Sequence, residues 1–283
     1  MLENLILFFL SQKISQNFQE KPENIFFESK ISSIEKKISD EKKSFRNFGK
    51  AGEVFDLKSG TVLWGKNQDL KLPMASLTKL MSILIILENH KLSEKVKIDA
   101  NSDLWRGSHV DIRIGEVFTV GDLIKGALIK SGNNAVIALA KYNSGTVDKF
   151  VEKMNKRAFE LGLKNTKFQN PIGFDDNGHY SSVGDLAVLA KYLYQKYDFV
   201  REVVKMKKGV IYSQNGRRVE FENTNKLLSD EVVGMKTGTT PKAGQCLISI
   251  VKKDGKELLF VVLGSNNRFG ETRSLIKFIF SKI

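Results

Sequence analysis

The chain has 283 residues, of which 41% are hydrophobic and 27% charged, a composition typical of a soluble globular protein with a sizeable core. A single cysteine, Cys246, excludes an intramolecular disulfide and a multi-cysteine metal site. The three histidines lack HExxH and Cys-His spacing, so we expect them at the surface or in turns and predict no metal and no cofactor.

The net charge is +13, and beyond residue 50 there are 36 basic and 25 acidic side chains, which suits binding to an anionic surface. Lysine is scattered, however, and arginine does not alternate with aromatic residues, so we predict no nucleic-acid partner.

The first 48 residues differ in composition from the rest of the chain. An apolar run at 5–10 is too short to span a bilayer, which takes about 20 apolar residues. Glu3 is the only charge before it and no A-x-A site follows, so it matches a secretory signal only weakly. Residues 11–48 are polar, with apolar positions on one helical face, and suit a stalk, a packing helix or a linker. We therefore predict a candidate signal or anchor at 1–48, with peripheral or N-terminal membrane association left open, and a folded domain at 49–283.

From residue 51 onwards the pattern predicts regular elements. In chain order they are strands at 53–57 and 61–65 joined by a hairpin turn, helices at 76–89, 121–127, 134–142, 147–161 and 182–197, strands at 232–236, 245–251 and 258–263, and a helix at 272–280. The helix at 76–89 is apolar nearly all round, which indicates a central, buried position. Strands at both ends of a helical middle predict an α/β fold of the α+β type, with one antiparallel sheet flanked by helices and a mostly helical insertion.

Ser76 and Lys79 form an S-x-x-K sequence at the start of this apolar helix. Positions three apart share a helical face, so the two side chains can meet. A serine hydroxyl needs a nearby base, and a buried lysine can serve because burial lowers its pKa from about 10.4. A helix N-terminus also directs backbone N–H groups at a developing oxyanion. In polar or amphipathic segments the lysine would stay solvated, and to such segments we assign the other S-x-x-K sequences, which begin at Ser33, Ser39, Ser249 and Ser274.

A second polar group, Ser131-Gly132-Asn133, interrupts the helical middle. A serine and an asparagine between two apolar helices would be buried and would need hydrogen-bond partners. Ser131 could relay a proton while Asn133 holds a substrate amide, or the segment could be a turn that only connects and caps the helices. The spacing alone does not decide, because S-x-N also begins at Ser15, Ser213 and Ser265.

A third sequence, Lys236-Thr237-Gly238, follows the apolar residues 232–235 at the predicted end of a strand. An edge strand with a small glycine lets a peptide lie alongside it, and the lysine and threonine could then bind a terminal carboxylate. The alternative is a solvated strand end. The pattern K-[ST]-G also occurs at 58–60, where it fills the predicted hairpin turn.

The three motifs occur in the order S-x-x-K, S-x-N and K-T-G, which is the set found in penicillin-binding proteins and class A β-lactamases. Over about residues 51–280 the sequence resembles the low-molecular-mass D,D-carboxypeptidases of peptidase family S11. The resemblance rests on the stretches AGEVFDLKSGTVLWGKN, LPMASLTKLMSILIILE, GEVFTVGDLIKGALIKSGNNAVIALA, FVEKMNKRAFELGLKNTKFQNPIGFDDNGHYSSVGDLAVLAKYL, NTNKLL and GMKTGTTPKAGQCLISIVKKDGKELLFVVLGS. It implies a penicillin-binding-protein/β-lactamase-like fold and a serine D,D-peptidase domain at 49–283.

The same resemblance implies a D-Ala-D-Ala carboxypeptidase that trims peptidoglycan stem peptides and is inhibited by β-lactams. Ser76 would attack the carbonyl of the penultimate D-Ala while Lys79 takes its proton. Ser131 would relay a proton to the leaving D-Ala, and Asn133 would orient the substrate. The substrate's terminal carboxylate would be bound along the strand by Lys236, Thr237 and Gly238. The oxyanion would be stabilised by the backbone N–H groups of Ser76 and Thr239.

Other functions remain open at this point. Asn134 stands where the family usually has Asp, which is a departure from the family pattern. Because peptidoglycan lies outside the membrane, the resemblance implies an extracytoplasmic enzyme of the cell envelope. A D,D-endopeptidase acting on cross-links is a close variant. A class A-like β-lactamase would need a deacylation base, and no glutamate can be assigned to that role. A non-catalytic peptidoglycan-binding module is the alternative from a different class.

Overall fold

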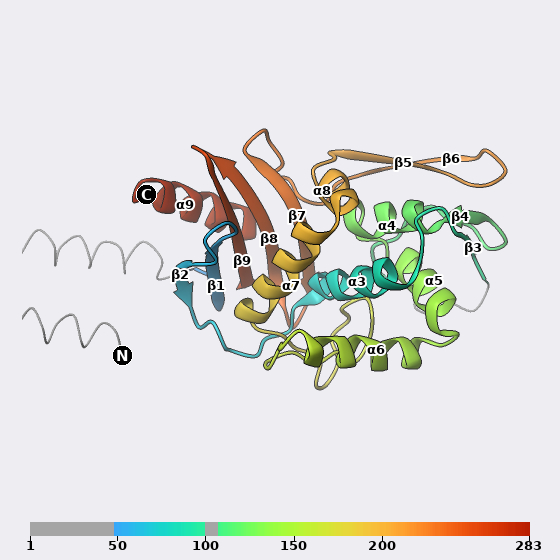
Figure 1. The fold of residues 1–283 in the computed structure, drawn as a ribbon, viewed down its shortest axis with the longest axis horizontal. Helices are drawn as coiled ribbons and strands as arrows, with labels where there is room; N and C mark the ends of the chain where they lie inside the picture. The colour runs from blue at the N-terminus through green and yellow to red at the C-terminus, as the bar shows by residue number, and fades with distance from the viewer. Residues whose placement is uncertain (1–47, 100–106) are drawn as a thin grey trace, which may run out of the picture. The chain divides into compact units, whose positions relative to one another are not determined.

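A five-stranded antiparallel sheet packs against a group of helices (Figure 1). The structure is a computed structural model that describes residues 48–99 and 107–283, and Phe48–Ile283 form one compact unit. The strand order β2-β1-β9-β8-β7 pairs the first hairpin with the end of the chain. Apart from Phe48, the predicted signal or anchor segment lies outside the described residues. The strands of this sheet are β1 (Ala51–Asp56), β2 (Val62–Lys66), β7 (Val232–Thr240), β8 (Gly244–Lys253) and β9 (Lys256–Ser265).

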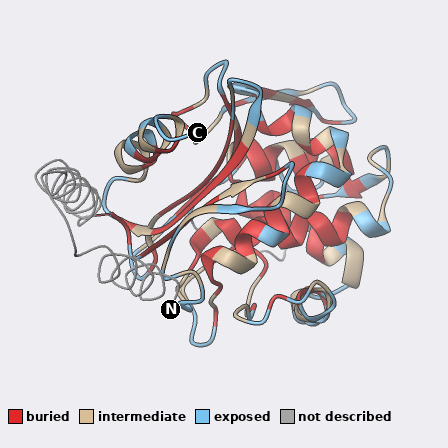
Figure 2. Ribbon diagram, turned by 60° about the vertical axis from the view of Figure 1, so that its left-hand side comes forward, coloured by how far each residue is buried: buried red, intermediate tan, exposed pale blue. Residues whose placement is uncertain are grey.

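Helices cover both faces of the sheet, as Figure 2 shows. Helix α9 (Arg268–Phe280) packs on β8 and β9, and α7 (Val183–Lys196) packs on β1 and β9. A strand covered on both faces has no solvated side, so its sequence is apolar at successive positions. This explains the continuous buried runs at 246–251 and 258–263.

The rest of the unit is helical and surrounds α3 (Lys79–Asn89), which packs against several other helices. Because neighbours enclose it, residues 79–86 are all buried, which confirms the prediction of a central helix. A 3-10 helix, η1, leads into α3 and packs against β7, so the start of the central helix lies at the edge of the sheet. The remaining helices are η1 (Ala75–Thr78), α4 (Val120–Ile129), α5 (Asn133–Ser144), α6 (Val147–Glu160) and α8 (Asp198–Val204).

Two small two-stranded sheets complete the described part: β3 (Lys95–Lys97) with β4 (Val117–Thr119), and β5 (Lys208–Tyr212) with β6 (Arg218–Glu222). The β5–β6 hairpin packs on α4 (Figure 1). Neither of these sheets was predicted, since every strand is brief and β3, β5 and β6 carry charged residues. Within residues 48–99 and 107–283, every helix is too short or too polar to cross a lipid bilayer.

The predicted antiparallel sheet with helices and a helical insertion is confirmed, and three of the differences from the predicted elements lie near the candidate site. The element expected as one helix at 76–89 is a 3-10 turn followed by an α-helix. The K-T-G sequence, expected at a strand end, lies inside β7, which continues to Thr240. The last helix begins at Arg268 rather than at 272, because the side chain of Asn267 caps it by accepting from the Gly270 N–H.

Candidate active site

Ser76 lies in the short turn η1, against which two other backbones pack closely. A Cβ atom at Gly173 would lie 1.9 Å from the carbonyl oxygen of Ala75, and one at Gly238 would lie 2.8 Å from the backbone nitrogen of Ser76. Ala75 has φ +49°, a left-handed conformation that is uncommon for a residue with a side chain. Strained residues of this kind are held by their surroundings and concentrate at functional sites. The turn is therefore clamped between a loop and strand β7.

The predicted contact between Ser76 and Lys79 is present, with 2.8 Å between the serine Oγ and the lysine Nζ. In a 3-10 turn the side chains of residues three apart eclipse each other, so the tighter turn also brings them together. Lys79 is fully buried, and burial, followed by the positive charge of Lys236, holds the pKa of the Lys79 amine well below its ordinary value. A neutral amine has a lone pair that can accept the serine proton.

A backbone carbonyl orients this amine. The oxygen of Ile172 accepts a hydrogen bond from Lys79 Nζ at 2.7 Å. Asn170 shapes the loop, because its Oδ1 accepts from the backbone N–H groups of residues 172–174 at 2.7 to 3.3 Å. With one N–H directed at Ile172, the Lys79 lone pair can point at Ser76. Sequence reasoning missed this acceptor, and the only signal for it is the Asn-Pro-x-Gly turn sequence at 170–173.

A second buried serine–lysine pair joins the break between α4 and α5 to strand β7. Lys236 Nζ donates to Ser131 Oγ at 2.8 Å and to the carbonyl of Thr237 at 2.9 Å. Burial, followed by the charge of Arg268, lowers the pKa of Lys236 to about 7. Ser131 has φ +64°, a second left-handed residue with a side chain. The break is thus more than a connecting turn, because its serine contacts a buried lysine across a long sequence separation.

Asn133 and Asn134 begin α5 and are both buried. The backbone N–H of Asn133 donates to the carbonyl of Ser108 at 2.8 Å, and a Cβ at Gly107 would lie 3.2 Å from its Nδ2. Asn134 pairs with the backbone of Val110: Oδ1 accepts from its N–H at 3.1 Å, and Nδ2 donates to its carbonyl at 2.7 Å. An aspartate could not donate in this way, so the asparagine at 134 has a structural reason of its own.

Strand β7 carries the K-T-G sequence along the edge of the sheet. The hydroxyl of Thr237 lies 2.6 Å from that of Thr224, in the loop before β7. At the start of α9, Arg268 donates from one guanidinium nitrogen to the carbonyl of Gly238 at 2.8 Å and to Oγ1 of Thr239 at 2.5 Å. Sequence reasoning missed both Thr224 and Arg268, since no local pattern connects them with β7.

His179 lies beside η1, the turn that contains Ser76. It follows a turn, as expected, but its ring is buried, with only 4% of the residue exposed. Its Nε2 lies 2.8 Å from Oγ1 of Thr78, and its Nδ1 accepts from the backbone N–H of Gln169 at 3.0 Å. Burial lowers the pKa of His179 to about 4, although Asp176 and Asp175 oppose the shift. The ring is therefore neutral near pH 7 and joins the loop at 169 to η1.

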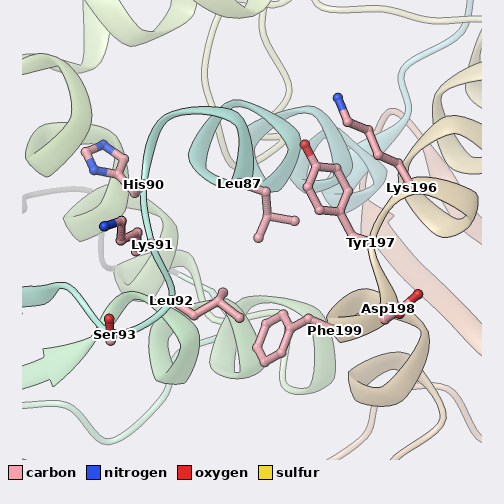
Figure 3. Close-up of a pocket in the computed structure, with 9 residues that line it drawn as sticks. All are labelled: Leu87, His90, Lys91, Leu92, Ser93, Lys196, Tyr197, Asp198 and Phe199. Carbon is pink, nitrogen blue, oxygen red and sulfur yellow. The ribbon is translucent and has the colours of Figure 1, made fainter.

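A hollow of about 590 Å³ lies elsewhere, between the end of α3 and the junction of α7 and α8 (Figure 3). Its lining contains none of the predicted site residues and consists of Leu87, His90, Lys91, Leu92, Ser93, Lys196, Tyr197, Asp198 and Phe199. Among residues 48–99 and 107–283, no three His, Cys, Asp or Glu side chains gather closely enough to hold a metal ion. The reactive side chains are instead collected on η1, the start of α3, the α4–α5 break and β7.

Comparison with known families and curated proteins agrees with this geometry. The family model Peptidase S11, described as D-alanyl-D-alanine carboxypeptidase, matches residues 49–267. D-alanyl-D-alanine carboxypeptidase DacF of Bacillus subtilis is 36% identical over 243 residues, which cover 82% of this chain and 62% of the relative. DacC of Escherichia coli is 37% identical and covers 79% and 59%. The chain thus spans about three fifths of the length of these two relatives.

Solved structures show the same fold. The crystal structure of the Streptomyces K15 DD-transpeptidase superimposes with a TM-score of 0.77 at 29% identity, and covers 82% of this chain and 97% of that one. The D-alanyl-D-alanine carboxypeptidase DacD of Francisella tularensis gives 0.74 at 27% identity, with 82% and 69% covered. These similarities confirm the predicted penicillin-binding-protein/β-lactamase-like fold.

Proposed function

Because the chain belongs to the S11 family of D-alanyl-D-alanine carboxypeptidases, we propose that it hydrolyses the D-Ala-D-Ala bond at the end of peptidoglycan stem peptides, with Ser76 as nucleophile. The observation that carries the proposal is the buried Lys79 amine, 2.8 Å from Ser76 Oγ and low in pKa. A base and a nucleophile within hydrogen-bond reach, with the base oriented by a third group, are the signature of covalent catalysis. Here the third group is the Ile172 carbonyl.

In the acylation step, Ser76 Oγ bonds to the carbonyl carbon of the penultimate D-Ala and its proton passes to Lys79 Nζ. The carbonyl oxygen takes up the negative charge and is stabilised by the backbone N–H groups of Ser76 and Thr239. The close approach of Gly238 to the Ser76 nitrogen supports this oxyanion site, because it places β7 beside η1. When the tetrahedral intermediate collapses, the C–N bond breaks and the terminal D-Ala leaves.

The leaving amine needs a proton, which Ser131 can supply. Its hydroxyl contacts Lys236, so the proton it gives up can be replaced from the buried lysine network. Asn133 would hold the substrate amide, and Lys236 and Thr237 would bind the terminal carboxylate beside Gly238. Water then attacks the acyl-enzyme, with Lys79 as base, and restores the free Ser76 hydroxyl.

The substrate class fixes the location that we propose. Peptidoglycan lies outside the cytoplasmic membrane, so we expect the enzyme in the cell envelope, either as a free protein or with peripheral or N-terminal membrane association. A β-lactam resembles the D-Ala-D-Ala end and would acylate the same serine. Removal of D-Ala from linear stem peptides and cleavage of cross-links would both proceed through that acyl-enzyme.

The test follows acylation and hydrolysis together on the full chain. Wild-type protein is incubated with benzylpenicillin and its intact mass is followed, while release of D-Ala from a peptide ending in D-Ala-D-Ala is measured separately. We expect one long-lived adduct and D-Ala release, both lost in Ser76→Ala. Ser274→Ala is the matched control, since it removes the exposed serine of another S-x-x-K sequence in α9. Rapid drug hydrolysis without a lasting adduct would indicate a β-lactamase, and no reaction with either compound would contradict the proposal.

A further inference from the structure

Thr224 occupies a loop that connects β6 to β7 and is fixed by its backbone. The N–H of Thr224 donates to the carbonyl of Ile129 at 3.1 Å, at the end of α4 and just before the Ser131 break. The preceding Asn223 fastens the loop from the other side, because its Nδ2 donates to the carbonyl of Met206 at 2.8 Å. The position of the Thr224 side chain is therefore set by two contacts that do not involve the reactive groups.

The hydroxyl of Thr224 has two acceptors nearby. Oγ1 of Thr237 lies at 2.6 Å, within the normal range for an O–H···O hydrogen bond, whereas the Ile129 carbonyl lies at 3.5 Å, beyond it. That carbonyl already accepts the Thr224 N–H. The Thr224 proton is thus best placed to point at Thr237. The proton of Thr237 is then free for another acceptor.

A ligand carboxylate can only accept hydrogen bonds, so a threonine that binds it must donate. If Thr237 donated to Thr224, its single proton would be used within the protein. If Thr224 donates instead, this competition disappears, and a chain of hydroxyls also polarises the final donor. Because Thr237 is only 4% exposed, water has little access to its hydroxyl and cannot readily replace Thr224 as its hydrogen-bond partner.

We propose that Thr224 is a positioning residue for carboxylate recognition: it donates to Thr237 and so keeps the Thr237 hydroxyl available to the terminal carboxylate of the substrate. The inference rests on the proposed D,D-carboxypeptidase function. It deepens that function by assigning part of the selectivity for a free C-terminal carboxylate to a residue outside the three motifs. In this assignment Thr224 acts through Thr237.

The experiment compares acylation by benzylpenicillin with acylation by its methyl ester, which lacks the charged carboxylate, for the wild type, Thr224→Val and Thr224→Ser. Second-order rate constants come from intact mass over time. Valine keeps the shape and removes the donor, so we expect the preference for acid over ester to fall about 3- to 10-fold, the value of one hydrogen bond. The ester rate should stay within about 2-fold, and serine should restore the wild-type preference.

Each other outcome has a distinct meaning. An unchanged preference in Thr224→Val, in an enzyme that is acylated normally, would overturn this inference and leave the proposed function intact. A parallel loss of acid and ester rates would also overturn it, because a merely structural role affects both compounds equally. A wild type that neither compound acylates, and that releases no D-Ala from a peptide ending in D-Ala-D-Ala, would contradict the proposed function and this inference together.

Discussion

Replacing His179 by glutamine tests how much the histidine stabilises η1, the turn that contains Ser76. The Nδ1 atom of His179 accepts from the Gln169 N–H, so the ring proton is on Nε2 and is donated to Thr78. Thr78 in turn donates to the carbonyl of Ala75 at 2.8 Å. This arrangement requires a neutral ring, because protonation of Nδ1 would place two N–H groups against each other.

The magnitude follows from the pKa of His179, which is about 4 in the folded protein and about 6.5 in an unfolded chain. Between these values the unfolded state binds more protons, so the free energy of unfolding rises with pH. The stabilisation is fully present above pH 6.5 and is lost as the pH falls through the folded value. At about 1.4 kcal/mol per pH unit, the whole window amounts to about 3 kcal/mol, of which about 2 kcal/mol is lost by pH 5.

The assay is urea unfolding at several pH values between 7 and 5, for the wild type, His179→Gln and the control His109→Gln, which removes an exposed histidine. Glutamine can still donate to Thr78 but does not titrate in this range. We expect the stability of His179→Gln to fall about 2 kcal/mol less than that of the wild type over this interval. The control should follow the wild type. Parallel curves for the wild type and His179→Gln would refute the reasoning.

Three further predictions concern the neighbouring contacts. Gly238→Ala should slow acylation by benzylpenicillin about 100-fold, measured by intact mass, because its Cβ would push β7 away from the nitrogen of Ser76. Asn134→Asp should lower the free energy of urea unfolding by about 1 to 3 kcal/mol, since the buried Val110 carbonyl would lose its Asn134 donor and keep only the Ile112 N–H. Arg268→Gln should move the alkaline limb of the acylation pH profile upwards, because Arg268 helps to lower the pKa of Lys236, the lysine that we propose binds the carboxylate. An unmoved limb would contradict that assignment.

Much of the scaffold was predictable because the decisive signals are local. The central, buried position of α3 follows from its all-round apolar sequence, which is a property of neighbouring residues, and it is confirmed. The strand pairs β1–β2 and β8–β9 follow from turn residues between apolar runs in the same way. The site residues were found through motifs, and the structure brings Ser76 to Lys79 and Ser131 to Lys236.

The remaining parts could not be predicted because they depend on contacts between distant segments. The carbonyl of Ile172 has no side-chain signature, and Arg268 reaches β7 only through the packing of α9. The S-x-x-K sequence that begins at Ser249 shows the opposite case, in which a local pattern is misleading. We assigned it to a polar or amphipathic segment, but Ser249 is fully buried in β8 while Lys252 is exposed. In a strand, residues three apart point to opposite faces, so this serine and lysine cannot act together.

The three basic side chains of the site, Lys79, Lys236 and Arg268, would allow one lysine to act as a base while another binds an anion. Burial and the charge of Arg268 lower the pKa of Lys236 to about 7, and burial and the charge of Lys236 hold that of Lys79 well below its ordinary value. A carboxylate bound at Lys236 would offset that charge. The pKa of Lys79 would then rise from its depressed value when the substrate is in place, and a stronger base would face Ser76 at the moment its proton must be removed. A ligand without the carboxylate would not raise the pKa of Lys79 in this way. The basicity of Lys79 and the recognition of the substrate's carboxylate would thus be coupled through Lys236.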